Sequence, residues 1–134
     1  MIGQVPGRVV LTYGVFDDFG PQTSARLRHL GGLGRELIVG CATDALCLRS
    51  GIRCALPYHQ RRAMLERARF VSRVIAQDCW DQLRTDIVNY NAGALALGEV
   101  PPFVDLQGLS DIVQLLEMPN TSATLSCAET RLAS

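Results

Sequence analysis

Two short apolar segments constrain the fold of this chain more than any other feature. Residues 8–16 read RVVLTYGVF and residues 36–43 read ELIVGCAT. Both are rich in β-branched and aromatic residues, and the second is apolar almost throughout, which is typical of a strand covered on both faces of a sheet. A segment with helical spacing lies between them. The sequence therefore predicts an α/β protein.

The same alternation continues along the chain. A helix is predicted from Pro21, with Leu27, Leu30 and Leu33 on one stripe, and GGLG at residues 31–34 ends it. The following elements are predicted in order: an irregular stretch at 44–57, a helix at 58–71, a strand at 73–77, a helix at 79–91, a strand at 94–99, and a region at 109–118 shared between the end of a helix and a last strand. The polar tail, residues 119–134, is predicted to be loop.

This order of elements predicts a doubly wound, mostly parallel, five-stranded sheet in a single domain, residues 1–134. The reason is that strand–helix–strand units connect by right-handed crossovers. Ligands of such sheets bind beyond the carboxyl ends of the strands, where the strand order reverses. We therefore expect residues 14–17, 42–44 and 98–99 to surround one crevice.

Composition narrows the class of ligand. Thirteen basic and thirteen acidic residues give a net charge of zero, which argues against nucleic acid or an anionic membrane as partner. All thirteen basic residues are arginines, so a bound phosphate would be held by guanidinium groups or backbone N–H groups. We find no signal segment and no apolar run long enough to span a bilayer, and we expect a cytoplasmic protein.

Five cysteines without a CxxC pair and only two histidines supply a metal site poorly. Free thiols in a reducing compartment are the favoured interpretation, and no metal ligands are predicted.

Arginine is concentrated between residues 49 and 73, where seven arginines face a single acid, Glu66. One interpretation is a polyphosphate site, for which Arg49, Arg53, Arg61 and, as a further candidate, Arg62 lie closest to the predicted crevice. The other is a solvated basic helix face, with Arg61, Arg62 and Arg69 pointing outward. The sequence leaves both open.

The turn at residues 14–23 would present backbone N–H groups and a helix N-terminus, which favours an anion. Thr23 fits an N-cap or the first helical turn. Asp17 and Asp18 fit either capping groups or ligands of a divalent cation that arrives with a nucleotide. Trp80 could stack on a base or simply pack, and Tyr13 and Phe16 fit the core or the crevice wall.

Several segments together resemble a known family. TYGVFD at residues 12–17, VGCATD at 39–44, the run from Tyr58 to Asn91, and ALGE at 96–99 follow its motifs. On these residues the chain resembles the glycerol-3-phosphate cytidylyltransferases of the HxGH nucleotidyltransferase superfamily, essentially without gaps from Thr12 to Gly98. The resemblance implies a Rossmann-like fold and transfer of CMP from CTP to glycerol 3-phosphate or a related polyol phosphate. It also implies assistance by Mg²⁺ and a dimer.

The resemblance also implies site residues. Those expected at the nucleotide and its phosphates are Tyr13, Gly14, Val15, Phe16, Asp17, Arg49, Arg53, Arg61, Trp80, Gly98, Glu99 and Ser126. Asp44 is expected on the side of the phosphate acceptor.

The departures from the family concentrate in its catalytic motif. HxGH falls on Gly20, Pro21, Gln22 and Thr23, so both family histidines are absent, and only His59 is a candidate substitute. One hypothesis is therefore a nucleotide-binding domain with degenerate catalysis and a regulatory or partner role. The alternative is an active nucleotidyltransferase with altered chemistry and a different nucleotide or acceptor. A structural subunit that pairs with an active paralogue is a third.

Overall fold

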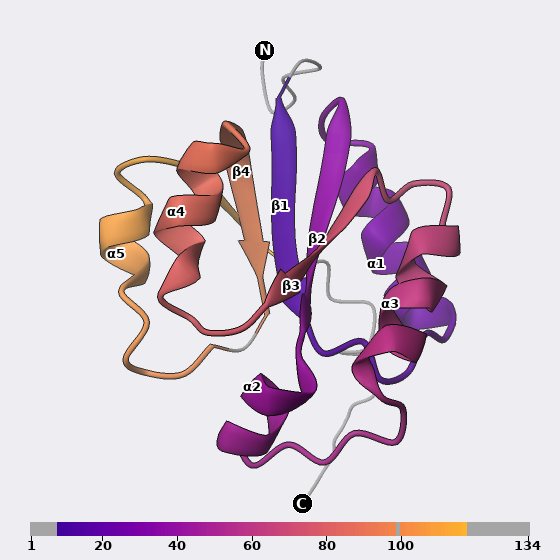
Figure 1. Cartoon of the computed structure of the whole chain (residues 1–134). Coiled ribbons are helices and arrows are strands. Elements are labelled where there is room, and N and C mark those ends of the chain that lie inside the picture. Colours follow the sequence, from indigo (N-terminus) through magenta and orange to yellow (C-terminus); the bar gives the residue numbers. More distant parts are fainter. Residues whose placement is uncertain (1–7, 99, 118–134) are drawn as a thin grey trace, which may run out of the picture.

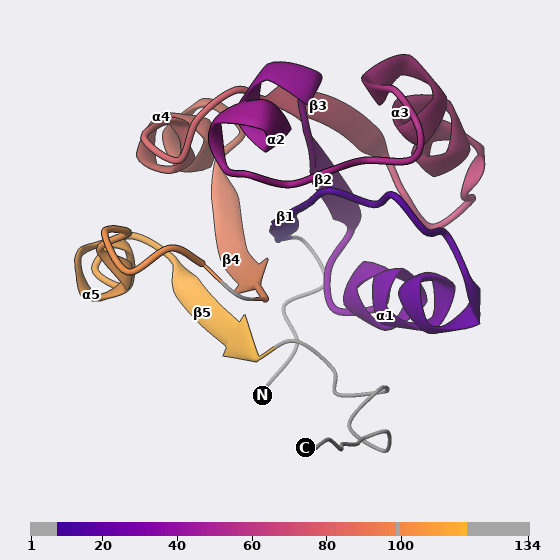
Figure 2. The ribbon, with the colours of Figure 1, turned by 90° about the horizontal axis from the view of Figure 1, so that it is seen from below.

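The computed structural model describes residues 8–98 and 100–117. Its sheet has five strands in the order β3-β2-β1-β4-β5, and every neighbouring pair is parallel. Figure 1 shows β1 to β4, and Figure 2 shows β5 beside β4. The strands are β1 (Val9–Gly14), β2 (Glu36–Ala42), β3 (Arg73–Gln77), β4 (Ala92–Leu97) and β5 (Gln114–Glu117). The helices are α1 (Pro21–Gly31), α2 (Asp44–Arg49), α3 (Tyr58–Arg67), α4 (Gln82–Asn89) and α5 (Leu106–Leu109). This arrangement confirms the predicted Rossmann-like α/β fold.

Helices cover both faces of the sheet. Figure 2 shows α1 and α3 on one side and α4 and α5 on the other. Alternate side chains of β1 supply the two cores: Val10 packs with Leu30 of α1, and Leu11 packs with Leu83 of α4. Burial on both faces explains why the central strands read as nearly unbroken apolar runs.

Helix α1 begins and ends as predicted. Pro21 occupies its first turn after Gly20, where the missing N–H of proline costs nothing. Leu27 and Leu30 are buried, and the N–H of Gly32 closes the carboxyl end on the carbonyls of Arg28 and His29.

The prediction of an irregular stretch at 44–57 is wrong for its first part, which forms α2. Thr43 caps this helix, since its Oγ1 accepts a hydrogen bond from the Leu46 N–H at 3.2 Å. The helix has only six residues, too few to show a period in the sequence. Other predicted boundaries also shift, and β4 covers Ala92–Leu97 where the prediction was 94–99. Helix α3 ends at Arg67 because Ala68 has extended backbone, and α4 begins at Gln82 because residues 78–81 form a turn.

Candidate ligand-binding site

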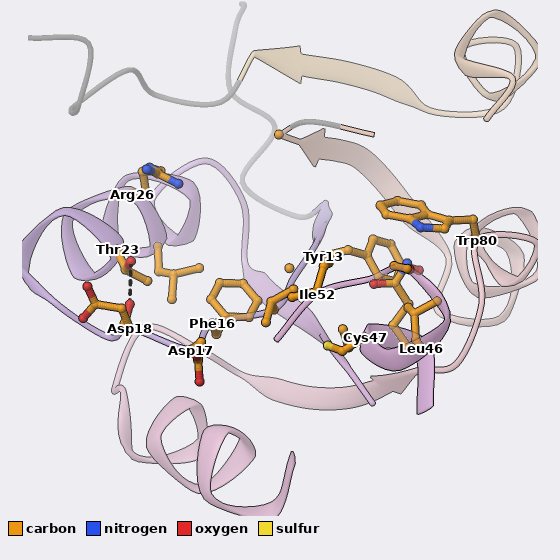
Figure 3. A pocket seen from close by; sticks show the side chains of 17 residues that line it. Tyr13, Phe16, Asp17, Asp18, Thr23, Arg26, Leu46, Cys47, Ile52 and Trp80 are labelled. Atoms are coloured by element: carbon orange, nitrogen blue, oxygen red, sulfur yellow. Dashed lines mark hydrogen bonds between the residues drawn. The ribbon is translucent and has the colours of Figure 1, made fainter. Parts of the chain in front are cut away.

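A pocket of about 350 Å³ lies beyond the carboxyl ends of β1, β2 and β3, next to α1 and α2 (Figure 3). It is the crevice that the strand order predicts. The predicted site residues that line it are Tyr13, Gly14, Val15, Phe16, Asp17, Thr23, Trp80 and Gly98. The side chains of Phe16 and Ile52 lie in its middle, and Arg26 and Trp80 lie at opposite ends.

Other predicted residues do not line this pocket. They are Gly20, Asp44, Arg49, Arg53, His59 and Arg61. Glu99 and Ser126 lie outside the described residues. Neither of the two histidines of the chain, His29 and His59, is among the lining residues, and both are exposed. The wall therefore carries much less positive charge than the arginine count predicts.

Arg61 is the largest fully buried side chain of the described residues, so its predicted place on the outer face of α3 is wrong. Its Nη1 donates to the carbonyl oxygens of Val15 and Ala42, both at 2.8 Å. Its Nη2 donates to Asp44 Oδ1 at 2.8 Å, and its Nε donates to the Leu56 carbonyl at 3.0 Å. A guanidinium group offers five N–H donors in a rigid plane, so one side chain can join segments from four parts of the chain.

Two other arginines of the predicted cluster, Arg49 and Arg62, are also engaged. Arg49 Nη2 donates to the Asp78 carbonyl. Arg62 donates to Glu66 Oε2 at 3.0 Å and to the Tyr58 hydroxyl at 2.9 Å. These contacts favour the interpretation of a structural and solvated basic face over a polyphosphate cluster.

Hydrogen bonds of Asp17 connect the β1–α1 loop to the segment that precedes α3. Its carboxylate accepts hydrogen bonds from the N–H groups of Ala55 at 2.7 Å and Leu56 at 2.9 Å. These two bonds hold the pKa of Asp17 below its usual range. Both carboxylate oxygens thus have backbone partners, which leaves Asp18 as the pocket carboxylate that faces solvent.

Next to Asp17, Phe16 has a φ angle of 57°, in the left-handed region that a bulky side chain rarely adopts. Its ring lies so close to Gly14 that a Cβ there would come within 2.9 Å of it. Strained backbone of this kind costs on the order of 1–3 kcal/mol and gathers at functional sites.

A buried polar network supports the opposite wall. The Tyr13 hydroxyl donates to Asp86 Oδ2 at 2.7 Å, and Gln82 Nε2 donates to the same oxygen at 2.8 Å. Gln82 Oε1 also accepts from the N–H groups of Asp78 at 2.7 Å and Cys79 at 3.2 Å. Burial, together with Asp86, raises the pKa of Tyr13 well above its ordinary value, so the phenol stays neutral. The network fixes the turn that carries Trp80 into the pocket.

Sequence reasoning missed three polar lining residues, Arg26, Ser50 and Gln77. Arg26 follows Thr23 by three residues, so the two share a helix face. Gln77 is the last residue of β3, at the edge where ligands bind. Both signals were present in the sequence. Leu46 and Cys47 were missed because α2 was not predicted.

Within residues 8–98 and 100–117, no three His, Cys, Asp or Glu side chains come close enough to hold a metal ion. No helix in the same part of the chain is long and apolar enough to cross a membrane.

The fold and the pocket at the strand ends together define a Rossmann-like α/β domain with a cavity at its carboxyl edge. The cytidylyltransferase-like family model matches residues 12–122, and the chain belongs to this family. The match spans the whole pocket, from the β1 loop to Gly98.

Two relatives are glycerol-3-phosphate cytidylyltransferases. That of Bacillus subtilis (strain 168) is 29% identical over 116 residues, which cover 84% of this chain and 86% of the relative. That of Staphylococcus aureus (strain NCTC 8325 / PS 47) is 30% identical over 89 residues, which cover 66% and 67%.

A similar solved structure is the lipopolysaccharide core biosynthesis protein from Thermoplasma volcanium GSS1. It superposes with a TM-score of 0.71 at 23% identity and covers 84% of this chain and 96% of that one. At this identity the likeness concerns the fold.

Proposed function

We propose that the chain binds a nucleotide-type ligand in this pocket and does not transfer a cytidylyl group. The observation that carries the proposal is the composition of the wall: its one basic residue is Arg26, and no histidine lines it. The shared family and the relatives that act as cytidylyltransferases support a nucleotide as the class of ligand. A regulatory or partner role, as a pseudoenzyme, follows from this combination.

Nucleotidyl transfer depends on preorganised donors, because negative charge develops on the phosphates as the acceptor attacks in line. Removal of one such donor typically lowers the rate by about 10²–10³. At the positions that match the family's histidines, Gly20 has no side chain to donate, and Thr23 Oγ1 donates to the Asp18 carbonyl at 3.1 Å. Arg61 acts here as a positioning residue, since backbone carbonyls and Asp44 occupy its donors.

Resident Mg²⁺ does not fit these residues. Asp17 accepts two backbone N–H groups, which leaves Asp18 as the carboxylate exposed at the wall. Mg²⁺ prefers several oxygen ligands in near-octahedral geometry. A divalent cation would therefore have to arrive with the phosphates of the nucleotide, and binding measured with and without Mg²⁺ tests this.

The alternative, an active nucleotidyltransferase with altered chemistry, needs donors from elsewhere. His59 lies in the first turn of α3, is exposed and does not line the pocket. We therefore favour binding without transfer. A homodimer, or a pair with an active paralogue, is part of the proposal, and light scattering after size exclusion tests the first of these.

Pyrophosphate release from CTP, glycerol 3-phosphate and Mg²⁺ tests the proposal directly. We expect none above background for the wild type, and measurable release for the variant Gly20→His, Gln22→Gly, Thr23→His. Position 20 accepts a side chain, because its φ is −85° and a Cβ there would be 3.4 Å from Asp18 Oδ1.

Ala25→His is the matched control, since it adds an imidazole to the exposed face of the same helix. Robust release by the wild type that Thr23→Ala abolishes would overturn the proposal and establish the alternative.

A further inference from the structure

Two buried side-chain nitrogens of the described residues have no hydrogen-bond partner, and both belong to residues that line the pocket. They are Arg26 Nε and Gln77 Nε2. A buried donor left without an acceptor costs about 1–3 kcal/mol, and most buried polar groups in native proteins are paired. Two such donors at one cavity indicate a site whose acceptors come from a ligand.

Gln77 is the stronger of the two observations. Its side chain is 1% exposed, so bulk water does not satisfy the amide. Packing alone does not require an amide at the end of β3, because an apolar side chain of the same length would fill the space without losing a hydrogen bond. The amide is therefore suited to a neutral oxygen or nitrogen acceptor of a ligand.

Arg26 determines how much negative charge the pocket can balance. It is the single basic residue of the wall, and Asp17 and Asp18 are the acids. One guanidinium can pair with one phosphate through parallel N–H donors. A triphosphate carries several negative charges, which this wall cannot neutralise and which the two aspartates would repel.

The rest of the wall is mainly apolar. Leu46, Cys47, Ile52 and Trp80 line it together with Tyr13 and Phe16. Arg26 lies at one end and Trp80 at the other (Figure 3). The apolar and aromatic side chains suit an uncharged, ring-bearing group, which Trp80 could contact with its face.

We infer that the pocket binds a nucleoside monophosphate, with Arg26 on its one phosphate and Gln77 donating to an acceptor on its uncharged part. The inference rests on the proposed function and narrows it from nucleotides to monophosphates. Arg26 lies outside the quoted segments through which the chain resembles its family, and Gln77 lies within the run from Tyr58 to Asn91.

Trp80 is the only tryptophan, so its fluorescence reports occupancy of the pocket and calorimetry gives the affinity. The probes are CMP, UMP, AMP and GMP. The monophosphate with the highest affinity is then compared with the triphosphate and the nucleoside of the same base, all without Mg²⁺. We expect the monophosphate to bind at least about tenfold more tightly than the triphosphate.

The variants separate the two contacts. Arg26→Met should lower the affinity for the monophosphate by about tenfold or more and change the affinity for the nucleoside by less than about twofold. The reason is that charge-assisted hydrogen bonds to the phosphate are the stronger kind. Gln77→Met should lower the affinities for the monophosphate and for the nucleoside by the same factor. Arg28→Met and Gln60→Met, which change exposed residues outside the pocket, are matched controls and should change neither.

The outcomes distinguish the inference from the proposed function. If the wild type binds none of the nucleotides with or without Mg²⁺, both fail. Tighter binding of the triphosphate, or an Arg26→Met affinity equal to wild type, overturns the inference alone. A thermal midpoint of Gln77→Met below wild type would reveal a structural role for the amide and also overturn it, since removal of an unpaired donor should not destabilise the free protein.

Discussion

Arg61 Nη2 lies 2.8 Å from Asp44 Oδ1, although the Arg61 side chain is fully buried and that of Asp44 is 58% exposed. The pair therefore joins the interior of α3 to the surface turn that begins α2. A buried guanidinium is tolerated because backbone carbonyls accept its other donors. Two of these carbonyls belong to Val15 and Ala42, which line the pocket, so Arg61 holds that part of the pocket in place.

Replacement of Arg61 should destabilise the fold. We expect Arg61→Met to lower the free energy of unfolding by about 2–4 kcal/mol, because it leaves buried carbonyl oxygens without donors. Urea denaturation followed by circular dichroism measures the loss. Arg69→Met, at an exposed position two residues past the end of α3, is the control and should change stability by less than about 0.5 kcal/mol. Equal stability of the two variants would show that Arg61 does not join these segments.

Stability should fall in acid through Asp17 and Asp44. Backbone N–H groups hold the pKa of Asp17 below its usual range, and the Tyr58 N–H and Arg61 do the same for Asp44. The unfolded chain therefore takes up protons at a higher pH than the folded chain does. The stabilisation is complete above the unfolded pKa of about 3.9 and is lost as the pH falls through the lower folded values.

Thermal midpoints of wild type and Asp44→Asn between pH 6 and pH 2 check this. We expect the difference between the two to shrink as the pH falls, because protonation removes the carboxylate from the wild type. A difference that stays constant with pH would contradict it.

Helix α2 should depend on its cap. Thr43→Ala removes the acceptor of the Leu46 N–H and should cost about 1 kcal/mol. Thr85→Ala, at an exposed interior position of α4, is the matched control and should be neutral or slightly stabilising, because alanine has the higher helix propensity. Chemical denaturation of both variants measures the two changes in the free energy of unfolding. A loss for Thr85→Ala as large as that for Thr43→Ala would exclude a specific capping role.

The thiols should differ in reactivity. Burial raises the pKa of Cys41 to about 11, and burial beside Cys54 raises that of Cys47 to about 11. At pH 8 both should remain protonated and react slowly with iodoacetamide, while the partly exposed Cys79 should react faster. Peptide mass spectrometry over a time course measures the three rates. Labelling of Cys47 as fast as that of Cys79 would show that the wall of the pocket opens readily.

The sequence by itself determined the order of most elements and the class of the sheet. Unbroken apolar runs identify β1 and β2 because both faces of these strands are covered, and Pro21 with its leucine stripe identifies α1. These signals are local, so the sequence is enough to read them. Residues 14–17, Ala42 and Gly98 line the pocket as the predicted crevice requires, since parallel strands bring their carboxyl ends to one edge.

Only the tertiary structure decided which way the charged residues point. Helical spacing assigns Arg61 to the outer face, but three acceptors from distant segments and the nearby Leu56 carbonyl satisfy its donors in the interior. The positions of Arg26 and Gln77 could be read from the sequence, but only the fold showed that Arg26 Nε and Gln77 Nε2 are enclosed without hydrogen-bond partners. Burial and hydrogen bonding across the chain are properties of the assembled fold, and no local pattern in the sequence encodes them.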